Sequence, residues 1–128
     1  MNTRERESKL RLDIRRRQDN LGALINRLQN GGPMIKGSVY IRKRLCGKPQ
    51  CRCVRGHRHQ DRVLAIRREG RVELRRLDPV GDAATEEAVL AWRQFRRYRI
   101  ELASACRGLI QAVDRMGRLR QAKPGGSR

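Results

Sequence analysis

The sequence predicts an α+β fold. An N-terminal helix is followed by a small three-stranded antiparallel, zinc-bearing β module and by a long C-terminal helix. Three observations support this: helical apolar spacing at both ends, alternating strand patterns between them, and a cysteine/histidine cluster inside the strand region. We expect the parts to be residues 1–33, 34–80, 81–120 and a disordered tail at 121–128.

The first segment predicts a helix over about Thr3 to Gln29. Its apolar residues follow a three-four spacing that Arg17 interrupts: Leu10, Ile14, Leu21, Leu24 and Leu28. The run Asn30-Gly31-Gly32-Pro33 predicts the end of this helix, with glycine at the C-cap and proline beyond it.

The middle segment predicts three strands. Residues 38–45 alternate, and we expect Val39, Ile41 and Leu45 to face inward, with the opposite face formed by Ser38, Tyr40, Arg42 and Arg44. Residues 62–68 and 71–77 flank Glu69-Gly70, a pair that favours a β-hairpin. Three strands are the smallest sheet that holds together, so a metal and a covering helix would have to support it.

The last segment predicts a helix over about Ala83 to Arg120. Its expected apolar seam is broken only by Arg99 and consists of Ala88, Trp92, Phe95, Leu102, Cys106, Leu109, Val113 and Met116. Cys106 is expected there as a buried small residue. Neither helix can bury its stripe alone, so we expect the two to pair as an antiparallel coiled coil, with part of the longer seam open to a homodimer partner.

Residues 46–59 hold three of the four cysteines and both histidines. Thiolate sulfur and imidazole nitrogen are the ligands that zinc prefers, and a closed structural site needs four of them. Cys46, Cys51 and Cys53 supply three ligands, and His59 or His57 supplies the fourth. Two other interpretations stay open, namely free thiols in a turn and a redox pair formed by Cys51 and Cys53.

The stretch from Arg44 to Cys53, Arg-Leu-Cys-Gly-Lys-Pro-Gln-Cys-Arg-Cys, resembles the signature of a family of small uncharacterised prokaryotic proteins classed as a domain of unknown function. The resemblance covers about residues 36–116 and is strong at 44–59. It implies a zinc-containing β-hairpin module followed by a long helix, and it favours His59 over His57 as the fourth ligand. The sequence departs from the signature at Gln60-Asp61-Arg62, where the family has Gly-Pro-Tyr.

The chain is strongly basic, with 32 Lys+Arg against 13 Asp+Glu and a net charge of +19. Residues 34–80 hold 14 basic and 4 acidic residues and so carry +10 of this charge. Such a surface favours nucleic acid as the partner, and arginine forks suit phosphate oxygens. The expected phosphate contacts are Arg42, Arg44, Lys48, Arg52, Arg55 and Arg58. Because only four aromatic residues are present, duplex or structured nucleic acid is favoured over an unstructured strand. We expect duplex DNA as the partner rather than RNA.

The sequence therefore predicts a zinc-stabilised, basic, nucleic-acid-binding protein rather than an enzyme or a binder of small-molecule substrates. A catalytic zinc needs an open coordination position and a nearby general base, and residues 46–60 contain no acid. The alternative is a coiled-coil adaptor that binds other proteins. With no apolar run of spanning length and no N-terminal signal, we expect a cytoplasmic protein without membrane contact.

Overall fold

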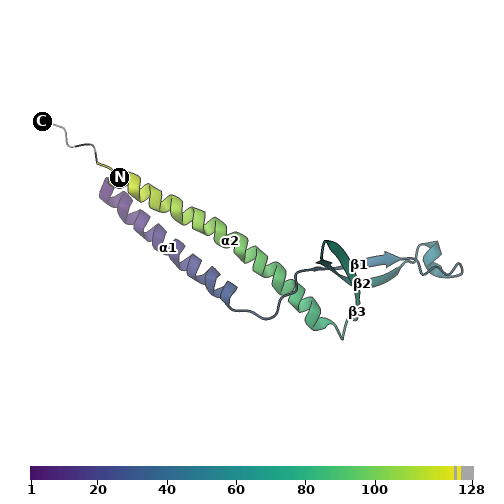
Figure 1. Ribbon diagram of the computed structural model, residues 1–128. Helices are drawn as coiled ribbons and strands as arrows, with labels where there is room; N and C mark the ends of the chain where they lie inside the picture. Colours follow the sequence, from purple (N-terminus) through teal and green to yellow (C-terminus); the bar gives the residue numbers. More distant parts are fainter. Residues whose placement is uncertain (123, 125–128) are drawn as a thin grey trace. The chain divides into compact units, whose positions relative to one another are not determined.

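The computed structural model describes residues 1–122 and 124 and confirms the α+β class, with two helices and a three-stranded antiparallel sheet (Figure 1). The elements in chain order are α1 (Thr3–Gln29), β1 (Ser38–Arg44), a 3₁₀ turn η1 (Arg52–Arg55), β2 (His59–Arg68), β3 (Arg71–Leu77) and α2 (Ala83–Arg120). The predicted disorder at residues 121–128 falls mostly outside the described residues. Within the described part of the chain, neither helix is long and apolar enough to cross a membrane.

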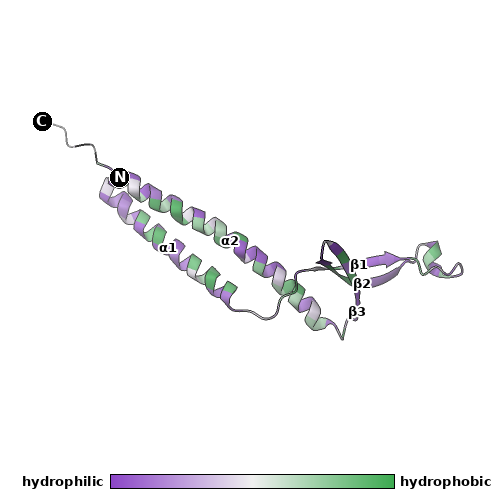
Figure 2. Ribbon diagram, viewed as in Figure 1, coloured by the Kyte–Doolittle hydropathy of each residue, from purple (hydrophilic) through white to green (hydrophobic). Residues whose placement is uncertain are grey.

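The chain divides into two compact units, and α2 contributes to both. The helical unit combines residues 1–31 with the chain from Phe95 onward, and the β unit spans Gly32–Gln94. Hydrophobic and hydrophilic residues alternate along both helices (Figure 2), as expected for helices that bury one stripe each.

Helix α1 is capped at both ends by asparagine. Asn2 accepts a hydrogen bond from the backbone of Glu5 at 2.8 Å, and the Glu5 side chain bonds back to the Asn2 backbone, which forms a capping box. At the other end, Asn30 has an extended backbone, and its side chain donates to the Asn26 carbonyl oxygen at 2.8 Å. The prediction of a glycine C-cap was wrong. Asn30 occupies the C-cap, and its side-chain amide already donates a hydrogen bond to the Asn26 carbonyl oxygen.

In the helical unit, α1 and the later part of α2 lie side by side and run antiparallel (Figure 1). Arg27, near the end of α1, lies over the ring of Tyr98 at 5.2 Å. Arg17, in the middle of α1, lies against Gly108. Leu10 and Leu119 line the same groove. Among the described residues of this unit, Leu24, Ala112 and Met116 are buried.

The seam of α2 differs from the predicted one. From Phe95 onward, and apart from Gly108, its less exposed residues follow an unbroken three-four spacing: Phe95, Tyr98, Leu102, Ala105, Leu109, Ala112, Met116 and Leu119. Cys106 and Val113 are exposed, so their assignment to the seam was wrong. The predicted heptad register ran through Arg99, Cys106 and Val113, whereas the less exposed positions lie one residue earlier, at Tyr98, Ala105 and Ala112.

The sheet is a meander with strand order β1-β2-β3. The β2–β3 connection is the two-residue turn Glu69-Gly70, between the paired residues Arg68 and Arg71. Both turn residues have positive φ angles, 52° and 77°, as a type I′ hairpin turn requires. Glycine adopts positive φ angles readily, whereas glutamate rarely does. The hairpin therefore holds Glu69 in a backbone conformation that is uncommon for its residue type.

One face of the sheet forms the core of the β unit. Leu64, Leu77 and Val89 are buried together, with Ile35, Val39 and Ile66 packed against them. Because Val89 belongs to α2, the first turns of that helix cover this face. The Ile35 amide donates to the Ala88 carbonyl oxygen at 3.0 Å, which ties the segment before β1 to the same helix.

The prediction of the inward face of β1 holds only at Val39. Ile41 and Leu45 are 55% and 53% exposed, whereas Arg42 and Arg44, expected to point outward, are half-buried. The apolar core reaches only the start of β1. Farther along the strand, the opposite face is filled by the arginines around Asp61.

Candidate metal centre

The cysteine-rich segment is the connection between β1 and β2. Arg44 and His59 are register partners at the end of this ladder, so the loop leaves and re-enters the sheet at one point. Cys46 follows β1 by two residues, and His59 is the first residue of β2. The antiparallel pairing alone therefore brings the first and last candidate ligands close together.

Two tight turns bring the remaining cysteines inward. The Cys51 amide donates to the Lys48 carbonyl oxygen at 3.1 Å, and the turn η1 begins directly after Cys51. Gly56 ends η1 in the left-handed conformation with a φ angle of 109°, which glycine adopts without a steric penalty. These turns fold the segment back on itself and leave Cys53 fully buried.

The side-chain donors of Cys46, Cys51, Cys53 and His59 all lie within 4.8 Å of one another. The Sγ atoms of Cys46 and Cys53 are 3.6 Å apart, and the Cys51 Sγ is 3.2 Å from the Nε2 of His59. An ion bound tetrahedrally with bonds of about 2.3 Å would separate two sulfurs by about 3.8 Å. The four donors are therefore spaced so that they can hold one metal ion.

The thiols do not have equal acidity. A backbone hydrogen bond from Cys46 is the main influence that lowers the pKa of the Cys53 thiol. A backbone hydrogen bond from Cys53 lowers the pKa of the Cys51 thiol, but the neighbouring sulfurs and burial outweigh it and leave that pKa raised. Since thiolates are the metal-binding form, loading of the site releases protons.

His57 and Arg58 lie next to this cluster with different surroundings. The ring of His57 is exposed and is not one of the four clustered donors. The Arg58 guanidinium donates to the Cys53 carbonyl oxygen. Arg58 therefore supports the backbone of the loop, in addition to the phosphate contact predicted for it.

Apart from Arg58, the predicted phosphate-contacting residues fall into two groups. Lys48, Arg52 and Arg55 are exposed on the loop, and none of them pairs with a carboxylate in the described part of the chain. Arg42 and Arg44, in contrast, bind the carboxylate of Asp61 from β1.

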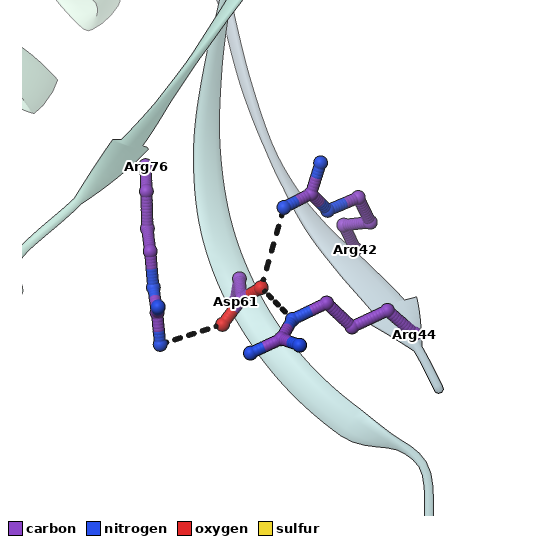
Figure 3. A network of polar contacts seen from close by, with 4 residues as sticks. All are labelled: Arg42, Arg44, Asp61 and Arg76. Atoms are coloured by element: carbon purple, nitrogen blue, oxygen red, sulfur yellow. Dashed lines mark hydrogen bonds and ion pairs between the residues drawn. The ribbon is translucent and has the colours of Figure 1, made fainter. Parts of the chain in front are cut away.

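Asp61 is the centre of a network that the sequence had not indicated (Figure 3). Its side chain is 2% exposed and accepts from Arg44 Nε at 2.5 Å and from Arg42 Nη2 at 3.3 Å, with Arg76 Nη2 at 3.0 Å from its other oxygen. The hydrogen bond from Arg44 is the main reason that the pKa of this carboxyl lies below its usual value. Because β2 was predicted to begin at residue 62, Asp61 was placed in the loop. A strand extended back to His59 would have put it opposite Arg42.

Comparison with known proteins places this site in a family. A model of the family described as "Domain of unknown function (DUF6788)" matches residues 11–83, more than half of the chain. The chain belongs to this family. The DUF6788 match includes most of α1, the whole sheet and the metal loop, so it begins earlier and ends earlier than the expected range of 36–116. No curated protein and no solved structure matches the chain.

Proposed function

We propose that this DUF6788 protein is a zinc-stabilised basic module that binds the phosphate backbone of nucleic acid, with duplex DNA as the preferred form. The observation that carries this proposal is the distribution of charge. Residues 34–80 hold +10 of the net +19, and the exposed cations of the metal loop have no neighbouring acid within residues 46–60. Unpaired arginines on a rigid loop suit phosphate oxygens.

The chemistry of the donors supports zinc as the metal. Three sulfurs and one imidazole nitrogen match the ligand preference of zinc in closed structural sites. A four-ligand site has no open position for a substrate, so the role proposed for the metal is to shape the loop. The loop then presents Lys48, Arg52 and Arg55 on a fixed backbone.

The salt dependence of binding tests the proposal. With roughly four to six phosphate contacts, the logarithm of affinity for a DNA duplex should fall against the logarithm of salt concentration with a slope near −4 to −5. The double substitution Arg52→Ala/Arg55→Ala should flatten this slope by about two and weaken binding equally on unrelated sequences. Arg15→Ala/Arg16→Ala removes the same charge from an exposed part of α1 and should leave the slope nearly unchanged. An unchanged slope in the loop variant, with zinc still bound, would exclude the metal loop from the interface.

For the helices we propose an antiparallel coiled coil. The unbroken three-four spacing of α2 from Phe95 to Leu119 supports it, as does the matching spacing of α1, in which Arg17 occupies one seam position. The seam is lined on α2 by the small residues Ala105 and Ala112, which allow the facing side chains of α1 to enter.

A second candidate function, as an adaptor that dimerises through its helices, is favoured by exposed apolar residues outside this seam. Ile110 and Val113 of α2 are 61% and 51% exposed. Ile110→Asp should convert a dimer to a monomer, as measured by light scattering, if the second stripe pairs with another copy. A wild-type protein that is monomeric at high concentration would exclude this alternative.

A further inference from the structure

The arginines on the two faces of the sheet differ in how they pair with carboxylates. On the face covered by α2, Arg62 pairs with Glu86 at 2.6 Å and Arg75 pairs with Asp82 at 2.9 Å. Each of these cations therefore has its own carboxylate. On the other face, here called the Asp61 face, Arg42, Arg44 and Arg76 all share Asp61.

The strand register establishes which residues share the Asp61 face. Arg42 stands directly opposite Asp61, and Arg76 stands opposite Val63, which is two residues farther along β2. Opposed residues in an antiparallel pair, and every second residue of a strand, point to the same side. His59 is also on this side, two residues before Asp61, so the arginine network adjoins the metal cluster.

The network presents positive charge to solvent and hides its negative charge. The Asp61 side chain is 2% exposed, whereas those of Arg42, Arg44 and Arg76 are 39%, 36% and 68% exposed. Three guanidinium groups and one carboxylate leave a net charge of +2. Since each guanidinium has five N–H donors and a carboxylate about four acceptor positions, most donors cannot be used by Asp61. The buried Nε of Arg42 has no partner within the described residues.

We propose that Asp61 holds Arg42, Arg44 and Arg76 as a preassembled receptor for a phosphodiester group of the bound nucleic acid. Free arginine side chains lose conformational freedom when they bind, at a cost in affinity. The shared carboxylate fixes the three guanidiniums before the ligand arrives and so reduces this cost. Arg76 and Asp61 thereby join the interface, Arg76 as a phosphate contact and Asp61 as a positioning residue. This inference rests on the proposed function.

For Asp61→Asn, we expect a change in DNA affinity opposite to the one that net charge alone would cause. Asp61→Asn adds one positive charge, which by charge alone would tighten binding to DNA. Loss of the fixed arginines should instead weaken binding by about fivefold or more. Glu73→Gln makes the same change in charge on the other face of the sheet, where Glu73 is 58% exposed and 3.8 Å from Arg68. It should leave affinity unchanged or raise it.

A second pair of variants tests the receptor without replacing the buried carboxylate, which keeps its ion pairs with Arg42 and Arg44. Arg76→Gln removes a 68% exposed side chain from the Asp61 face of β3, and Arg71→Gln removes an exposed arginine from the opposite face of the same strand. Arg76→Gln should flatten the salt slope by about 0.9, the value for one lost phosphate contact, and Arg71→Gln should leave the slope unchanged.

The measurement is fluorescence anisotropy of the zinc-loaded full chain with DNA and RNA duplexes of the same sequence, at several salt concentrations. Equal slopes for the Arg76 and Arg71 variants, with wild-type binding intact, would overturn the receptor and leave the proposed function standing. A wild-type protein that binds neither duplex would overturn both. Loss on one duplex only would identify which nucleic acid supplies the phosphodiester.

Discussion

The guanidinium of Arg17 on α1 occupies the space beside Gly108 of α2 that a β-carbon on that glycine would fill. Arg17 is also held by Asp13, one turn earlier on α1, at 3.0 Å. Arg17, the polar residue in the α1 seam, therefore lies opposite Gly108, a residue of α2 that has no side chain. A polar group at such a position can specify the alignment of two helices, at some cost in stability.

Replacement of Gly108 by alanine should therefore stabilise the protein less than an ordinary glycine replacement in a helix. Gly117→Ala is the matched control, because nothing lies within 4 Å of the added carbon. The control should raise the free energy of unfolding by about 0.5–1 kcal/mol. Gly108→Ala should gain little or nothing, since Arg17 must move. Urea denaturation measures both, and equal gains would show that Arg17 does not use this space.

The end of the segment that leads into β1 is equally close-packed. A β-carbon at Gly37 would lie 2.8 Å from the carbonyl oxygen of Ala65, a backbone atom that cannot move without breaking the β1–β2 ladder. Gly37→Ala should lower the free energy of unfolding by about 1–3 kcal/mol. Gly32→Ala, where nothing lies within 4 Å, should have no such effect. Similar stabilities for the two variants in denaturant would contradict the packing described here.

Removal of a metal ligand should affect the β unit and spare the helices. Cys51→Ser should lower the zinc content of the purified protein and loosen the sheet, because metal binding and local folding are coupled in small modules. Cys106→Ser is the control, since Cys106 is exposed and lies outside the cluster. It should retain one zinc per chain. Elemental analysis and amide hydrogen exchange report the two effects, and full zinc content in Cys51→Ser would reject this ligand.

The core of the helical unit can be tested at two neighbouring positions. Leu24 is 4% exposed and Ile25, the next residue, is 43% exposed. Leu24→Asp should bury an unpaired charge and lower the free energy of unfolding by several kcal/mol. Ile25→Asp should have a much smaller effect. If the two variants melt at the same temperature, α1 does not pack through the predicted face.

The sequence allowed the elements to be predicted well because their signals are local. The spacing of Leu10 to Leu28 and the Glu69-Gly70 turn each specify structure within a few residues. The choice of face was less accurate where it depended on tertiary partners. Ala105 and Ala112 line the seam of α2, whereas the predicted heptad register assigned Cys106 and Val113 to it. Only the position of α1 opposite α2 determines which of these stripes is buried.

The candidate metal site was predictable for the same reason, since its four donors are contained in fourteen consecutive residues. The Asp61 network was not, because its arginines come from two other strands. Arg42 is 19 residues from Asp61, and Arg76 is 15 residues from it on the other side. Alternation predicts that such side chains share a face, but only the register shows that they meet.

The compactness of the metal loop also affects the order in which the chain can assemble during synthesis. All four donors are available once residue 59 has left the ribosome, and their strand partner β1 precedes them. A metal ion could therefore be captured while β3 and the start of α2 are still inside the exit tunnel. A nascent chain with a bound ion would expose fewer reactive thiolates to oxidation, and the closed β1–β2 connection would provide a template on which β3 can pair.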